Sequence, residues 1–285
     1  MTALPDSLRW MVATWSFAVG AVVGSFLNVV IARVPAGESI VHPRSRCPSC
    51  RTPIAWWDNL PVLSWLALRG RCRTCRTRIS WRYPLVELLG GAAALVSVSR
   101  HGLSLAALAE FAFAATLLAL AFIDLDTWLL PHAITLPLLG AGLVLSALHV
   151  TPAASILGSV AGAAAGWVGF ALVAFLGERI LKKEALGFGD VWLLAAIGAW
   201  LGIASLLPVV LLASLQGTVI GLALIILGRS QPGPPPDAGP EDTEADWVPP
   251  RHAVPFGPFL ALGALEWLWL QAWITGVVPG LSIFR

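Results

Sequence analysis

The sequence predicts an all-α, polytopic membrane protein of about eight transmembrane helices, with one small domain inserted after the first helix. Hydrophobic residues make up 57% of the 285 residues, and the mean hydropathy is +0.79. Charged residues make up 12%, against about 25% in soluble domains. Apolar segments of about 20 residues recur, and basic residues are divided unequally among the segments that connect them. These observations exclude a water-soluble enzyme.

Seven apolar segments supply the predicted helices. Residues 10–31 are too long for a removable signal peptide and lack a clear small-residue cleavage pattern. Residues 191–227 are uncharged and too long for one span, and a break at residues 202–208 divides them into two helices. Residues 85–98 are short and carry Glu87 just inside one end. The other segments are residues 103–123, 133–150, 153–176 and 256–278.

The distribution of basic residues predicts the orientation. Eight spans place both termini on one side, and with the termini outside, fifteen Lys and Arg residues lie in the inner segments and three outside. Ten of the fifteen are Arg residues between positions 33 and 82. We therefore divide the chain into a first helix (1–32), a cytoplasmic domain (33–82) and a membrane domain (83–285), in which residues 229–254 form a flexible cytoplasmic loop. The formal net charge of +2 gives no indication of nucleic-acid binding.

All four cysteines lie in the cytoplasmic domain. They form two Cys-x-x-Cys pairs, Cys47 with Cys50 and Cys72 with Cys75, separated by 21 residues. This spacing is typical of a structural zinc site, in which four thiolates complete the tetrahedral coordination that zinc prefers. Two structural disulfides are the alternative, but disulfides rarely persist in a reducing compartment. Because four protein ligands leave no open position, we expect the zinc to be structural.

Acidic residues follow or begin two of the spans. Asp124 and Asp126 directly follow the segment 103–123, and Asp190 follows Gly187 and Gly189 at the start of the sixth segment. Acids at the ends of spans are candidate functional residues, and two adjacent carboxyl groups that share one proton can activate water against an amide. The two glycines would allow a sharp turn or the approach of a substrate strand. The alternative is that Asp190 caps a helix and the other acids are solvated turn residues.

Two other classes of protein would explain part of the sequence. A proton-coupled transporter also carries acids in its helices, but it predicts internal repeats and acids near the bilayer midplane, neither of which the sequence shows. A zinc-binding membrane adaptor would explain the cysteines and leave the acidic motifs unexplained.

The run of small residues at 158–169 is expected to allow close helix packing.

Six motifs resemble, in order, those of the bacterial type IV prepilin peptidases, GxGD aspartic proteases that also act as N-methyltransferases. The resemblance runs nearly end to end. The motifs are GSFLNVVIARVP (24–35), WWDNLPVLSW (56–65) followed by RGRC (69–72), DLDTWLLP (124–131), GFGD (187–190), AIGAWLG (196–202) and PFGPFLALG (255–263).

The resemblance implies that Asp124 and Asp190 are the catalytic pair, with Asp126, Gly187 and Gly189 in supporting roles. Asp124 is preferred because it lies seven residues before Pro131, as in more distant GxGD relatives. Two positions depart from the family pattern, since His132 stands where an acid is common and Trp192 where a lysine is common. We expect His132 to lie close to the acids of the 124–131 motif.

The resemblance also implies the substrates and cofactors. The substrates are membrane-inserted type IV prepilins and type II secretion pseudopilins, which are processed in the bacterial inner membrane by a site that faces the cytoplasm. The cofactor is S-adenosylmethionine, which donates the methyl group to the new N-terminus. Nothing in the spacing of the residues assigns methyl transfer, for which Glu38, Asp58 and Glu87 are candidates. A peptidase without methyl transfer is the alternative.

Overall fold

The computed structural model describes residues 5–153, 155–181, 187–227 and 254–284. Within these ranges the chain forms helices and no β-strand, which confirms the all-α prediction. The helices are α1 (Asp6–Arg33), η1 (Trp56–Asn59), α2 (Leu63–Ala67), α3 (Arg82–His101), α4 (Leu105–Thr127), α5 (His132–Ala147), α6 (Ile156–Leu181), α7 (Phe188–Leu201), α8 (Ile203–Ile226), α9 (Gly257–Val277) and η2 (Pro279–Phe284).

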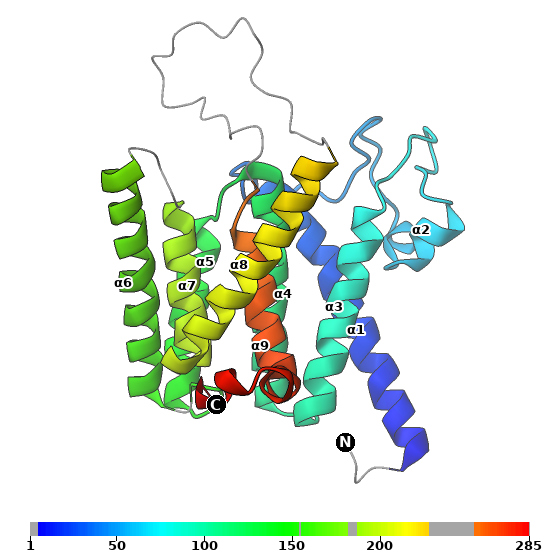
Figure 1. Cartoon of the computed structure of the whole chain (residues 1–285). Helices are drawn as coiled ribbons and strands as arrows, with labels where there is room; N and C mark the ends of the chain where they lie inside the picture. The colour runs from blue at the N-terminus through cyan, green and yellow to red at the C-terminus, as the bar shows by residue number, and fades with distance from the viewer. Residues whose placement is uncertain (1–4, 154, 182–186, 228–253, 285) are drawn as a thin grey trace, which may run out of the picture.

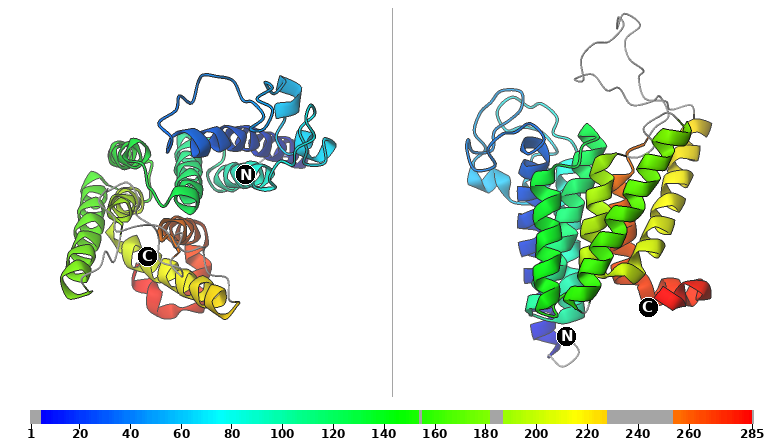
Figure 2. Two further views of the ribbon diagram at one scale, coloured as in Figure 1. Left: turned by 90° about the horizontal axis from the view of Figure 1, so that it is seen from above. Right: turned by 90° about the vertical axis from the view of Figure 1, so that its left-hand side faces the viewer.

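The long helices run side by side as one bundle, with α8 inclined across it (Figure 1). At one end the cysteine-bearing segment and α2 stand beside α1 and α3, and the end of α4 and the start of α7 lie at this same end (Figures 1 and 2). We call it the cysteine end. The start of α1 and η2 are both at the opposite end, on different sides of the bundle. This placement agrees with an even number of spans.

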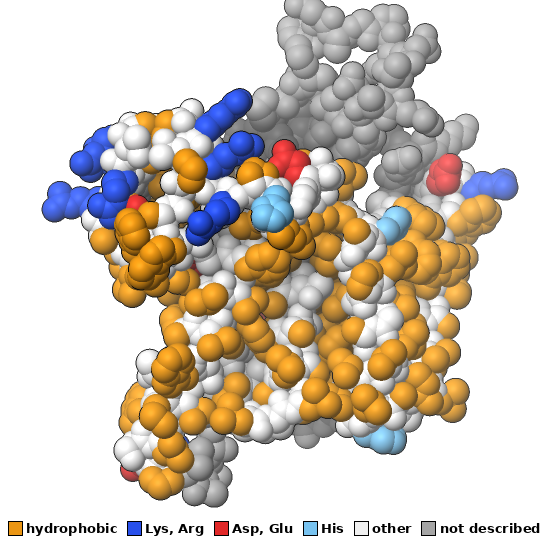
Figure 3. Space-filling model, turned by 180° about the vertical axis from the view of Figure 1, so that it is seen from behind, with side chains coloured by type: hydrophobic (Ala, Val, Ile, Leu, Met, Phe, Trp, Pro, Cys, Tyr) orange, Lys and Arg blue, Asp and Glu red, His pale blue; other side chains and the backbone are white. Residues whose placement is uncertain are grey.

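The protein is a multi-pass membrane protein. Five of the described helices, α1, α4, α6, α8 and α9, are long and apolar enough to cross a bilayer by length and composition. The predicted spans at α5 and α7 are apolar but shorter, and α3 has polar ends that include Arg82 and Arg100. Hydrophobic side chains cover the flank of the bundle, and basic side chains gather at the cysteine end (Figure 3).

The long apolar segment divides at Gly202, as predicted. Gly202 has a φ of +82°, a conformation that favours glycine, and it separates α7 from α8. Pro208, which lies at the other end of the predicted break, is instead buried inside α8. The break therefore depends on the glycine and not on the proline.

Helix α7 lies at the centre of the bundle. Almost all of its residues from Asp190 onward are buried, and Trp200 stacks on Phe113 of α4 with ring centroids 4.8 Å apart. The indole N–H of Trp200 donates to the carbonyl of Leu138 at 2.7 Å. These contacts fix α7, and with it Asp190, against α4 and α5.

Small residues allow α6 to approach α7 closely, as the sequence predicts. A Cβ at Gly162 would collide with the backbone of Gly198, and a Cβ at Gly166 would lie 2.7 Å from the carbonyl oxygen of Leu194. At Gly169, two turns from Gly162, a Cβ would meet nothing within 4 Å. The close contact is therefore confined to part of the predicted stretch.

Some sequence-based predictions fall outside the described residues. The loop predicted at 229–254 lies there except for residue 254, and so do Lys182, Lys183 and Glu184.

Candidate active site

Asp124 lies in the last turn of α4, and its side chain points into the protein. The residue is 5% exposed, and its Oδ2 accepts a 3.0 Å hydrogen bond from the backbone N–H of Gly257, the first residue of α9. A Cβ at Gly257 would lie 2.5 Å from the same oxygen. A larger residue at position 257 would therefore displace the carboxyl group that α9 contacts.

Asp190 lies in the first turn of α7, where the helix dipole presents its positive end. The residue is 7% exposed, and its Oδ1 is buried without a hydrogen-bond partner in the part of the chain that the structure describes. Buried polar atoms normally have partners, so an unpaired one is an indication of function. The atom is free to bind water or a substrate group.

Leu130 connects the surroundings of the two acids. A Cβ at Gly189 would lie 2.8 Å from the Cβ of Leu130, and one at Gly257 would lie 3.3 Å from its Cδ1. Leu130 thus lies against the glycine that precedes Asp190 and against the glycine that contacts Asp124. The predicted pair therefore comes together in space, although 66 positions separate the two residues in the sequence.

The structure gives Gly189 and Gly187 a more limited role than the sequence suggested. Gly189 provides room for Leu130, as described above. Gly187 has a φ of −66°, which any residue adopts, and a Cβ there would be in ordinary contact with Asp190 Oδ2 at 3.4 Å. The predicted need for a sharp glycine turn is thus not seen.

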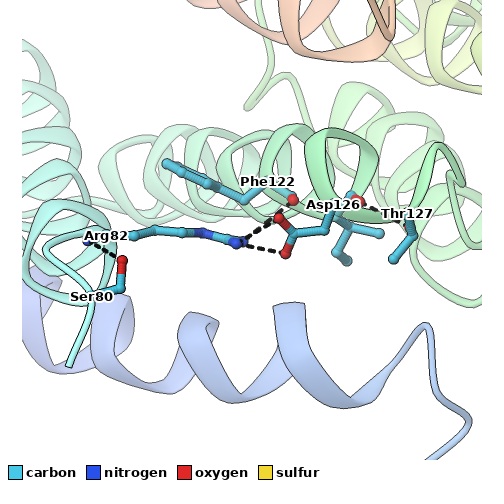
Figure 4. Close-up of polar contacts among 6 residues, drawn as sticks. Ser80, Arg82, Phe122, Asp126 and Thr127 are labelled. Carbon is cyan, nitrogen blue, oxygen red and sulfur yellow. Dashed lines mark hydrogen bonds and ion pairs between the residues drawn. The ribbon is translucent and has the colours of Figure 1, made fainter. Parts of the chain in front are cut away.

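Asp126, in contrast, turns away from the pair. Its two carboxylate oxygens each lie 2.6 Å from one guanidinium nitrogen of Arg82, the first residue of α3 (Figure 4). Its side chain is 41% exposed. The two acids of the 124–131 motif therefore differ in environment, since one is buried beside α9 and the other is paired at the surface.

His132 and Trp192, the two residues that depart from the family pattern, contact each other. The rings of His132 and Trp192 lie 6.0 Å apart in an edge-on arrangement, and Trp192 also packs against Trp167 and Phe188. The described contacts of His132 are with this aromatic cluster and do not include the acids. The expectation that His132 lies beside the acids stays a prediction.

The four cysteines converge at the predicted site. Their sulfur atoms all lie within 4.8 Å of one another, and none forms a disulfide. The two pairs sit on similar turns, in which Arg51 and Arg76 occupy matching positions with positive φ. In each turn the N–H of this arginine donates to the carbonyl of the first cysteine, Cys47 or Cys72. The cluster can hold a metal ion.

The second cysteine of each pair is prepared for metal binding. Hydrogen bonding with Thr77 lowers the pKa of the Cys75 thiol to about 6, and hydrogen bonding with Thr52 lowers the pKa of Cys50 in the same way. A lowered pKa favours the thiolate, which is the form that binds metals.

The three acids that the sequence offered for methyl transfer line one cavity beside the cysteines. They are Glu38, Asp58 and Glu87. Asp58 accepts hydrogen bonds from Arg73 at 2.6 and 2.8 Å, which lower the pKa of its carboxyl group. Glu87 accepts a 2.7 Å hydrogen bond from the N–H of Val62.

Sequence reasoning did not anticipate the contacts made by Gly257 and Arg82. Gly257 lies in the PFGPFLALG motif, and a glycine next to a proline at the start of a helix is the available signal. Arg82 is one of the ten arginines between positions 33 and 82, and nothing in the sequence pairs it with Asp126.

Comparison with known proteins covers both parts of the site. The model of the bacterial peptidase A24 N-terminal domain matches residues 18–101, which include the cysteines, and that of the type IV leader peptidase family matches residues 111–222, which include Asp124 and Asp190. A Myxococcus xanthus protein named prepilin leader peptidase/N-methyltransferase is 40% identical over 98% of this chain and 96% of its own length.

Relatives in other bacteria carry the same name. One from Burkholderia pseudomallei is 39% identical over 92% of this chain and 85% of its own length. One from Neisseria gonorrhoeae is 40% identical over 81% of this chain and 87% of its own length. No solved structure matches the chain.

Proposed function

Because the chain belongs to the type IV leader peptidase family, we propose that it removes the leader peptide from type IV prepilins and type II secretion pseudopilins and N-methylates the new N-terminus. The observation that carries the peptidase half is the convergence of Asp124 and Asp190, two buried carboxyl groups beside Leu130 at one end of the bundle.

In this proposal the two carboxyl groups share one proton. The ionised carboxylate takes a proton from water, and the water oxygen attacks the carbonyl carbon of the scissile amide. The protonated carboxyl group donates to the carbonyl oxygen. Collapse of the tetrahedral intermediate breaks the C–N bond. The leaving amine takes the proton that the first carboxyl group removed from water, and the second carboxylate takes a proton from a hydroxyl of the intermediate as the new carboxyl group forms. The N–H of Gly257 holds Asp124 in place through these steps.

Asp126 has a supporting role. Its ion pair with Arg82 satisfies both of its oxygens, so it has no need to share a proton with another acid. We propose that the pair anchors the start of α3 to the catalytic end of α4. It thereby links the start of α3, which follows the cysteine-bearing segment, to the end of α4 that carries Asp124.

We assign zinc to the four thiolates, in a structural role, since all four ligands come from the protein. S-adenosylmethionine, when bound, supplies an electrophilic methyl group on a sulfonium sulfur. The basic side chains at the cysteine end support an orientation in the bacterial inner membrane in which this end faces the cytoplasm. An apolar substrate helix would lie in lipid and place its scissile bond at this face.

The test uses full-length enzyme in detergent and a prepilin substrate, with cleavage and methylation followed by intact mass. We expect Asp124→Asn and Asp190→Asn to lower the cleavage rate by at least about a hundredfold, in the range of general acid–base catalysis. The control Asp126→Asn is expected to remain within about tenfold of wild type, since loss of a surface ion pair is a small perturbation.

Each half of the proposal can fail separately. Near wild-type cleavage by the Asp124 or Asp190 variant would exclude the catalytic pair. A mature product that never gains the mass of one methyl group would leave a peptidase without methyl transfer.

A further inference from the structure

A large cavity lies between the cysteine-bearing segment and the membrane helices. Its volume is about 740 Å³, within the range of about 300–1,000 Å³ that small-molecule sites occupy. One wall comes from α1, including Asn28, and another from the start of α3, including Tyr83. The cysteine-bearing segment forms the rest, with Cys47 and Cys72 among the lining residues. The cavity therefore exists only while that segment is folded against the helices.

Two side chains of the cavity are held rigidly. The indole N–H of Trp65 donates to the carbonyl of Ile79 at 3.1 Å, and its ring packs on Gly70, where a Cβ would lie 2.8 Å away. Gly70 has a φ of +64°, so glycine is favoured there on both grounds. Glu87 accepts a hydrogen bond from the backbone N–H of Val62, a β-branched residue with a φ of +61°. Such strained residues cluster at binding sites, because ligand contacts can require them.

The charges of the cavity are arranged by depth. Glu87 is 9% exposed and the Asp58 side chain 11%, whereas the Arg73 side chain is 60% exposed. Arg46 and Arg78, which also line the cavity, are exposed. Two acidic side chains thus lie inside, whereas Glu38 and three of the arginines are exposed at the rim. This arrangement suits a ligand with a buried positive charge and an acidic group near solvent.

We propose that this cavity binds S-adenosylmethionine, an inference that rests on the methyl transfer part of the proposed function. The ligand carries a sulfonium cation and an amino group, which the inner acid Glu87 would attract, since Asp58 is already paired with Arg73. Its carboxylate suits the arginines at the rim, and its adenine ring suits the indoles of Trp57 and Trp65.

The position of the cavity fits successive reactions on one substrate. Tyr83 and Pro84 line it, and the preceding residue, Arg82, forms the ion pair with Asp126. Asp126 is two residues from Asp124, so the cavity and the acidic pair share the cysteine end of the bundle. A new N-terminus released beside the acids would have a short path to the methyl donor.

The experiment measures binding directly, by equilibrium dialysis with labelled ligand and full-length, zinc-loaded enzyme in detergent. S-adenosylmethionine and S-adenosylhomocysteine are compared because the second lacks the sulfonium charge. Trp57→Ala removes a lining ring, and its control is Trp56→Ala, the neighbouring and more exposed tryptophan that does not line the cavity. Glu87→Gln removes a lining charge while keeping an acceptor for Val62, and its control is Glu266→Gln in α9.

We expect Trp57→Ala to weaken binding of both ligands by about tenfold or more, as loss of base stacking does. Glu87→Gln should weaken S-adenosylmethionine about tenfold and S-adenosylhomocysteine much less, since only the first carries the sulfonium charge. Both controls should bind like wild type. Retained prepilin cleavage shows that each variant is folded.

Two results would overturn the inference. If wild type binds both ligands and the two lining variants bind them equally well, the site lies elsewhere and methyl transfer itself still stands. If wild type binds neither ligand, the inference and the methyl transfer function fail together, while the cleavage assay still judges the peptidase half.

Discussion

One guanidinium nitrogen of Arg82 lies 2.6 Å from each carboxylate oxygen of Asp126, and this contact joins the first residue of α3 to the last turn of α4. The guanidinium also lies 4.9 Å from the centre of the Phe122 ring. Asp126 is therefore occupied in an interaction between helices, whereas Asp124, two residues earlier, is buried against α9. Their difference in chemistry follows from the helix, which places residues two apart on different faces.

The Arg82–Asp126 pair should contribute little to global stability. Both side chains are partly exposed, at 29% and 41%, so we expect a coupling free energy of about 0.2–1 kcal/mol. A double-mutant cycle with Arg82→Gln and Asp126→Asn, measured by unfolding in mixed micelles, gives this value. A coupling free energy of several kcal/mol would contradict this prediction and show that the ion pair contributes substantially to stability.

Gly257→Ala should impair cleavage without unfolding the protein. The new Cβ would lie 2.5 Å from Asp124 Oδ2, so the carboxyl group must move, and a displacement of about 1 Å can lower a rate by about a hundredfold. Intact-mass kinetics measure the effect. The control is Gly221→Ala in α8, where a Cβ would meet nothing within 4 Å, and it should cleave like wild type. Equal rates for the two variants would contradict the role given to Gly257.

Gly162→Ala should lower the stability of the bundle. The Cβ would collide with the backbone of Gly198, and overpacking of this kind costs about 1–3 kcal/mol. Gly169→Ala, on the same helix, adds a methyl group in open space and should be neutral or stabilising by up to about 1 kcal/mol. Thermal midpoints in one detergent compare the two. A larger loss for Gly169→Ala would mean that α6 packs by another face.

Removal of the metal should unfold the cysteine-bearing segment and leave the bundle intact. We expect about one zinc per chain in wild type and none in a Cys47→Ser, Cys72→Ser double variant, because two thiolates rarely retain structural zinc. Limited proteolysis should then cut between residues 34 and 81, while far-UV circular dichroism changes little. Full zinc content in the double variant would show that the metal is held elsewhere.

The sequence was sufficient to predict features that depend on local spacing. The cysteine pairs are close enough in the chain for their turns to be recognised, and they converge as expected. The division at Gly202 was also predictable, because glycine favours a positive φ where a helix ends. Pro208 did not mark the end of a helix, since a proline can remain inside a helix when tertiary packing buries it.

Contacts between residues far apart in the sequence could not be predicted from it. The hydrogen bond from Gly257 to Asp124 joins positions 133 apart, and the bond from Val62 to Glu87 depends on a strained residue. Neither leaves a periodic signal in one sequence. The contact between His132 of α5 and Trp192 of α7 likewise joins different helices.

The shortness of α7 has a consequence for how the enzyme would respond to its lipid surroundings. Its 14 residues span about 21 Å, less than a hydrocarbon core of about 30 Å, and neighbouring helices enclose nearly all of it. A change in bilayer thickness would therefore act on the tilt of outer helices such as α6 and α8. Asp190, carried by the enclosed helix, would keep its depth relative to Asp124, so hydrolysis would tolerate membranes of differing thickness.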